Sequence, residues 1–108
     1  MKKLFLMLAV GVFTFFPNKG LCASAEDIDR LTTYAILTGR GLGCGYDMQN
    51  ELSRVGSWMD RTFENNEKSA LILVFATGME QAAKEQANGS SPDNCATIRK
   101  VIAKTVWP

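Results

Sequence analysis

Residues 38–47 read TGRGLGCGYD and place four glycines at alternate positions around Cys44. A dinucleotide-binding loop needs glycines at its positions 1, 3 and 6, and no register of this stretch provides them. A P-loop needs a glycine followed by Lys and then Ser or Thr, and the chain contains no such tripeptide. We therefore assign the stretch to helix packing, ahead of a ligand-contacting backbone or an alternating strand.

The glycines of this stretch have helical spacing. Gly39 and Gly43 lie four residues apart, as do Gly41 and Gly45, so in a helix each pair exposes bare backbone on one face. Another helix can approach closely at such a face. Because each glycine costs up to about 1 kcal/mol of helix propensity, we expect the helix to end within the stretch, anchored there by Cys44.

The segment before the glycines predicts the body of that helix. Acidic residues at positions 26, 27 and 29 suit the positive end of the helix dipole. The apolar residues that follow lie close to one helical face; they are Ile28, Leu31, Ala35 and Leu42.

A second helix is predicted from Asp47, a favourable N-cap. Its apolar positions recur at steps of four, three, four and four, which is one buried stripe; they are Met48, Leu52, Val55, Met59 and Phe63. Trp58 lies beside this stripe, and Arg54 and Arg61 share the opposite flank. Tryptophan and arginine are enriched in interface hot spots, so these three residues are our candidate partner-binding face, with a merely solvated face as the alternative.

Two further helices complete the predicted domain. Residues 64–68 read as a polar connection, and residues 70–87 as a helix that stops at Asn88-Gly89. The run 70–76 could also be a buried strand, but the helical spacing continues through it. Since this helix is apolar nearly all round at its start, we expect it to be the central one.

The last helix is predicted to begin at Ser91, with Pro92 in its first turn. It carries Cys95 on its apolar face. Trp107 follows the helix and must either fold back on the core, which we favour in so small a domain, or stay available as a further partner contact.

The first 25 residues have the three parts of a secretory signal peptide: a basic start, an apolar run from Leu4 to Phe16, and a small-residue site ending at Ala25. The run reaches only about 20 Å as a helix, too short for the bilayer core of roughly 30 Å. We expect cleavage after Ala25, with Ala23 or Ser24 as alternative ends. Lipid attachment at Cys22 is disfavoured, because the residue before it is a bulky leucine. Residues 26–108 then form one domain.

Cleavage changes both the cysteine count and the charge. Cys44 and Cys95 remain as an even pair, and an oxidising compartment favours their disulfide. Nine basic and eleven acidic residues remain, a net charge of −2. A chain with this net charge lacks the concentration of basic residues that binds nucleic acid or a membrane surface. The predicted fold is thus an all-α bundle of about four helices stapled by one disulfide.

The chain contains no histidine. This excludes Ser-His and Cys-His nucleophile pairs and the HExxH zinc motif, and paired cysteines leave no thiolate for a metal site. Asp60 and Glu64, four residues apart, could form a carboxylate pair, but this spacing is more typical of an exposed helix face. We therefore expect no catalysis, no metal and no cofactor. We predict a periplasmic protein-binding module such as an inhibitor, an immunity factor or an accessory subunit of an envelope or secretion machine, with another envelope protein as its partner. In layout the chain resembles small acid-stress chaperones of the bacterial periplasm and some periplasmic immunity proteins. The alternative is therefore a holdase-type stress chaperone.

Overall fold

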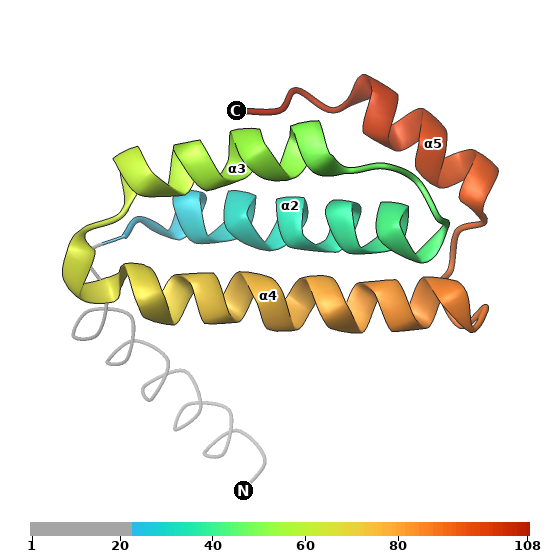
Figure 1. Cartoon of the computed structure of the whole chain (residues 1–108), viewed down its shortest axis with the longest axis horizontal. Coiled ribbons are helices and arrows are strands. Elements are labelled where there is room, and N and C mark those ends of the chain that lie inside the picture. The colour runs from blue at the N-terminus through green and yellow to red at the C-terminus, as the bar shows by residue number, and fades with distance from the viewer. Residues whose placement is uncertain (1–22) are drawn as a thin grey trace, which may run out of the picture.

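The computed structural model describes residues 23–108, and it confirms the small all-α bundle (Figure 1). Most of the predicted signal peptide lies outside these residues. Within them there are four helices and no strand. The helices are α2 (Ala25–Gly43), α3 (Gln49–Thr62), α4 (Asn65–Ala87) and α5 (Cys95–Lys104).

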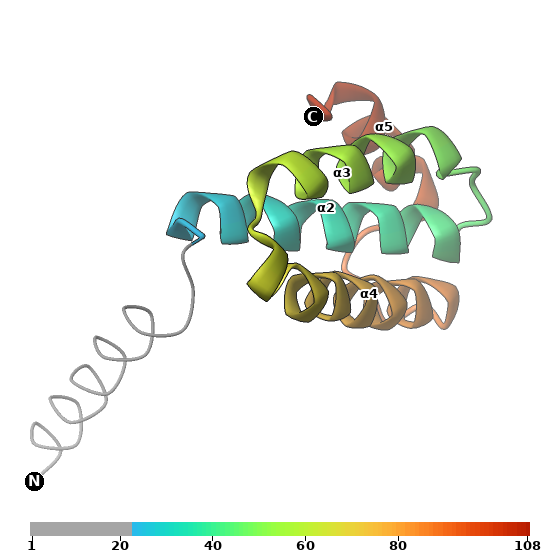
Figure 2. The ribbon, with the colours of Figure 1, turned by 60° about the vertical axis from the view of Figure 1, so that its left-hand side comes forward.

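The central helix is α2, not α4 as the sequence had suggested. Figure 1 shows α2 between α3 and α4, and Figure 2 shows the same order with α5 on the α3 side. The reason is that α2 offers apolar or small residues to every neighbour. Leu31 and Tyr34 are buried in the aromatic core, whereas Gly39 and Gly43 meet α4.

Local side-chain and backbone bonds set both ends of α2. The Ser24 hydroxyl accepts a hydrogen bond from the Asp27 backbone N–H at 3.0 Å, which is a normal N-cap. A mature chain cleaved after Ala23, one of the alternative ends, would keep this cap. At the other end Gly45 has φ +82°, and the Tyr46 N–H donates to the Gly41 carbonyl at 2.9 Å. This is a Schellman stop, so the predicted helix end within the glycine stretch is confirmed.

Gly39 and Gly43 are where α2 and α4 come closest. A Cβ atom added to Gly39 would lie 2.8 Å from the Ala82 Cβ, and one added to Gly43 would lie 2.8 Å from the Gln86 Cβ. Both additions would also press on α4 backbone carbonyls. The close helix approach expected from the glycine spacing is therefore present.

The predicted disulfide joins Cys44 to Cys95, with their Cα atoms 5.7 Å apart. It ties the residue after α2 to the first residue of α5. The Tyr46 hydroxyl adds a hydrogen bond to the Cys95 carbonyl at 2.9 Å. Both connections hold α5 against the glycine-rich end of α2.

Helix α3 begins one residue later than predicted. Asp47 does cap the first turn through its side chain, which accepts from the Gln49 N–H at 3.0 Å, but Met48 occupies the N-cap position. The Met48 side chain is buried, which fixes where the helix can begin.

Helix α4 begins at Asn65, inside the segment that we had read as a connection. Only two residues separate it from α3. Phe63 is buried in the core and keeps this link short.

Helix α5 begins at Cys95, because the Asn94 side chain accepts from the Thr97 N–H at 2.9 Å. The predicted start at Ser91 is therefore wrong. Both segments carry start signals, and the disulfide selects the later one by placing Cys95 beside α2.

Candidate protein-binding surface

Trp58, our main candidate contact on α3, is a core residue. Its side chain is only 4% exposed, and its ring meets Tyr34 and Phe63 edge-on at centroid distances of 5.4 and 5.5 Å. It lies three residues after the buried Val55, so it widens the apolar stripe of α3 instead of flanking it. The prediction that Trp58 is an accessible contact is wrong.

Trp107 packs on the core, and Arg54 binds the tail that carries it. Trp107 stacks on Tyr34 at 5.5 Å and donates its indole N–H to the Ile102 carbonyl at 3.2 Å. Arg54 donates to the Pro108 oxygen at 3.0 Å and to the Trp107 carbonyl at 3.3 Å. The tail therefore folds back on the core, as favoured above. Of the four predicted contact residues, only Arg61 has an exposed side chain without such an intramolecular role in the contacts described here.

A guanidinium group covers the aromatic core from outside. The Arg30 guanidinium carbon lies 4.8 Å from the Trp58 ring centroid, a favourable cation–π distance. Arg30 also donates a hydrogen bond to the Tyr34 hydroxyl at 3.0 Å. This bond is the main cause that raises the pKa of Arg30 above its usual value. These contacts give Arg30 a structural role at the edge of the aromatic core.

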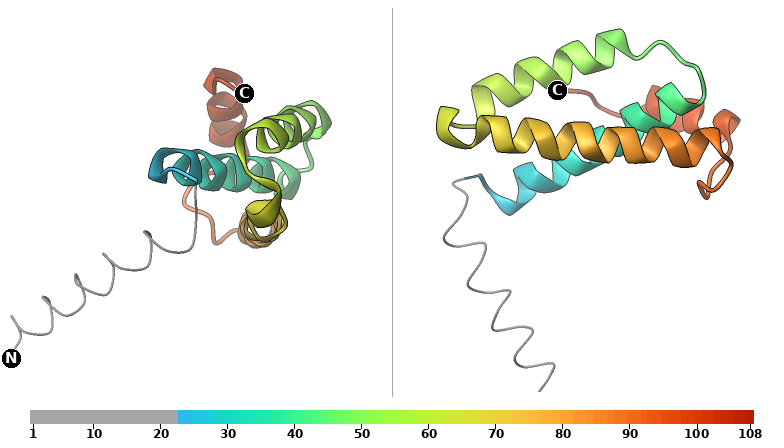
Figure 3. Two further views of the ribbon diagram at one scale, coloured as in Figure 1. Left: turned by 90° about the vertical axis from the view of Figure 1, so that its left-hand side faces the viewer. Right: turned by 60° about the horizontal axis from the view of Figure 1, so that its bottom comes forward.

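The accessible apolar surface lies instead on α4. Leu73 is 67% exposed, and its neighbours Ile72 and Val74 are 50% and 53% exposed. Single exposed aliphatic side chains are common, but three adjacent ones on one helix form a patch. The view in Figure 3 (right) brings α4 to the front, and no described helix covers it on that side.

The outer face of α4 consists of small residues around Leu73. At 100° per residue, the positions within about 60° of Leu73 line one side of the helix. Near the centre they are uncharged and exposed, namely Ser69, Ala70, Ala76 and Thr77. No charged residue occurs between Lys68 and Glu80. We call the exposed residues of 69–77 the outer face of α4.

The opposite side of the same helix is fully packed. Leu71 and Phe75, each two residues from Leu73, are buried in the core cluster. Ala82 and Gln86 continue this side toward the glycines of α2. Helix α4 therefore has two apolar sides, of which the described fold covers one.

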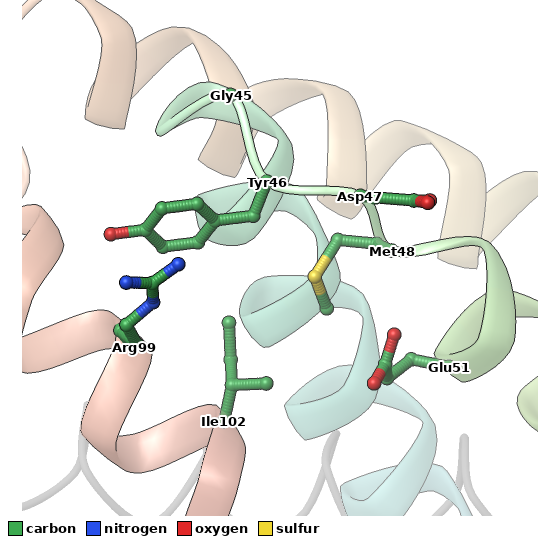
Figure 4. Close-up of a pocket in the computed structure, with 7 residues that line it drawn as sticks. All are labelled: Gly45, Tyr46, Asp47, Met48, Glu51, Arg99 and Ile102. Carbon is green, nitrogen blue, oxygen red and sulfur yellow. The ribbon is translucent and has the colours of Figure 1, made fainter.

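A cleft of about 430 Å³ lies between the α2–α3 connection and α5 (Figure 4). Met48 and Ile102 are its apolar side chains, and Arg99 lies against the Tyr46 ring at 5.0 Å. The Asp47 side chain points away from that pair in Figure 4. Arg99, the one cation among the lining residues of the cleft, is thus already engaged with an aromatic ring. The cleft therefore has no set of side chains that would select a class of ligand.

Within residues 23–108, no helix is long and apolar enough to span a membrane. The same part of the chain holds no cluster of three or more Cys, Asp or Glu side chains that could bind a metal ion.

Comparison with known families, curated proteins and solved structures finds no match to this chain.

The outer face of α4 was missed because a continuous apolar run resembles a buried element. A signal was nevertheless present. Residues 70–76 are apolar on all sides of a helix, and a bundle with only three other helices, two of them short, has too little surface to cover every side of the longest one.

Proposed function

We propose that the chain is a small exported, non-enzymatic protein-binding module, and that the outer face of α4 is its contact surface. The observation that carries the proposal is the exposure of Ile72, Leu73 and Val74 in a domain whose other large aliphatic residues are mostly packed. Exposed apolar patches of this kind mark interaction sites in soluble proteins.

The chemistry of this surface favours binding over catalysis. Residues 69–79 include no charged or titratable side chain, so the surface offers no general acid or base that could activate the hydroxyls of Ser69 and Thr77. What it offers is aliphatic area framed by small residues, which suits the approach of another helix or a flat apolar surface.

The disulfide supports the exported part of the proposal. Bonds of this kind form and persist in oxidising compartments, whereas cytosolic thiols are kept reduced. The Cys44–Cys95 bond closes a sequence separation of 51 residues in a domain too small to rely on its core alone. It is compatible with the periplasm, where another envelope protein would be the partner.

The outer face of α4 also suits the alternative, a holdase-type chaperone that covers unfolded chains. A dedicated module forms complexes of fixed stoichiometry at one surface, whereas a holdase binds many unfolded chains without fixed register. The stoichiometry of the complexes separates the two. We place the dedicated module first, because the exposed aliphatic residues are confined to one stretch of a single helix.

In-cell photocrosslinking tests the proposal. A photoreactive benzoylphenylalanine is placed at position 73, and in a matched control at position 57, which is exposed on α3. We expect discrete crosslinked adducts from position 73 and none from position 57. A ladder of many adducts would indicate the holdase. If position 73 gives no adduct, the proposed contact surface is wrong.

A further inference from the structure

The side chains of α4 are arranged almost symmetrically about Leu73. Residues 69–77 read SALILVFAT. Counting outward from Leu73, Ile72 matches Val74, and then Leu71 matches Phe75. Beyond them alanine matches alanine at positions 70 and 76, and serine matches threonine at positions 69 and 77. A two-fold rotation about Leu73 therefore brings each residue type of this stretch to a position opposite its own kind.

We propose that the outer face of α4 pairs with the same face of a second copy of this chain, antiparallel, with the two-fold axis at Leu73. This inference rests on the proposed function and names the partner of that surface. An isologous contact uses one patch twice, and the repeat of residue types about Leu73 lets each side chain of the patch meet one of its own kind across the axis.

The antiparallel pairing brings matching side chains together. Two copies of Leu73 meet at the axis, and Ala70 of each copy faces Ala76 of the other, where the absence of bulk permits close approach. Ser69 faces Thr77 of the second copy, and their hydroxyls are placed to exchange a hydrogen bond. The exposed halves of Ile72 and Val74 then close over the sides of the contact.

Charges favour this direction over the parallel one. The first charged residues beyond the outer face toward the C-terminus are Glu80 and Lys84, whose side chains are 73% and 70% exposed. Within one chain these two side chains form an ion pair at 3.9 Å, and in a parallel pair each would also face the like charge of the second copy. In the antiparallel pair Glu80 faces Asn66, whose amide can donate to the carboxylate.

The interface is small, because it involves one helix from each copy. Contacts of this size fall at the low end of specific interfaces. We therefore expect a reversible dimer with a dissociation constant in the micromolar range or weaker.

Sedimentation velocity over a micromolar to millimolar concentration series tests the pairing. The parent chain should shift from monomer to dimer, and Leu73→Asp should remain monomeric throughout. The matched control is Val106→Asp, which places the same charge on an aliphatic residue that is 86% exposed on the tail. It should dimerise like the parent. A parent that stays monomeric at millimolar concentration, or a dimer that survives Leu73→Asp, overturns the proposal.

Disulfide trapping tests the antiparallel direction. Leu73→Cys should crosslink to itself on oxidation. Ser69→Cys should not, because the two copies of position 69 lie about 12 Å apart along the axis, eight residues at 1.5 Å each. A mixture of Ser69→Cys and Thr77→Cys chains should crosslink to each other. If Ser69→Cys links to itself as readily as Leu73→Cys, the antiparallel pairing is wrong.

Failure of the self-pairing can be distinguished from failure of the proposed function. A chain that is monomeric in solution but crosslinks to a different protein from position 73 retains the contact surface and loses the self-pairing. An adduct of twice the chain mass supports the second copy. Absence of both a dimer and any adduct removes both proposals.

Discussion

The two sides of α4 differ in what covers them, although both are apolar. Toward α2 the helix packs through Leu71 and Phe75 at one end and meets the glycine backbone at the other. On the outer side Leu73 is mostly exposed. Since the two sides have similar hydrophobicity, the composition of α4 does not decide which one is buried.

The shape of α2 decides which side of α4 is buried. Gly39 and Gly43 let the α4 backbone approach closely, and helices in such close contact share a narrow strip of side chains. The aliphatic residues outside that strip remain at the surface. Close packing on one side of α4 therefore leaves the other side available to a partner.

Removal of the disulfide, which holds α5 against the end of α2, should have the largest effect on stability. We expect the double variant Cys44→Ser with Cys95→Ser to lose about 4 kcal/mol of unfolding free energy, from the entropy of the closed loop. Urea unfolding of the oxidised parent and of the variant measures this loss. A loss below about 1 kcal/mol would mean that glycine packing holds α5 and the end of α2 without the bond.

A larger side chain at the contact between α2 and α4 should have the next largest effect on the unfolding free energy. Gly43→Val should lower the unfolding free energy by about 1–3 kcal/mol, because the new side chain meets α4 backbone. The control is Gly56→Ala on α3, where an added Cβ has no atom within 4 Å. That variant should gain up to about 1 kcal/mol from helix propensity.

An unchanged stability of Gly43→Val, combined with loss of binding to a phosphorylated ligand, would contradict the packing role. It would restore the ligand-contacting alternative for residues 38–47.

Substitutions of the exposed arginines of α3 should have the smallest effects on the unfolding free energy. Arg61→Ala should change the unfolding free energy by less than about 0.5 kcal/mol, and Arg54→Ala by up to about 1 kcal/mol because it releases the tail. Neither should change dimerisation or the adducts from position 73. Loss of those adducts in Arg61→Ala would show that the contact surface extends to α3.

The sequence was sufficient for the features that a residue spacing or a cysteine count specifies. The all-α fold, the Cys44–Cys95 bond, the helix end among the glycines and the helix approach at Gly39 and Gly43 were predicted from spacing and residue type. Each follows from a spacing or a count that can be used without knowing how the helices are arranged.

The features that depend on packing between helices were predicted less well. Trp58 was taken for a surface contact, although its distance of three residues from Val55 places it on the buried stripe. The start of α5 was set at Ser91, because two adjacent segments carry capping signals and only the position of Cys95 beside α2 selects between them. The central helix was misassigned for a related reason, since an apolar run does not reveal how many of its sides have neighbours.

Leu71 and Leu73 allow one measurement of the difference between the two sides of α4. They are the same residue, two positions apart on one helix, and are 3% and 67% exposed. Urea unfolding of Leu71→Ala and Leu73→Ala, at a protein concentration low enough to keep the chain monomeric, compares them directly. Leu71→Ala should lose about 2–5 kcal/mol of unfolding free energy, and Leu73→Ala should stay within about 0.5 kcal/mol of the parent. Equal losses in the two variants would show that the outer face of α4 is covered within the chain itself, and would contradict its assignment as a contact surface.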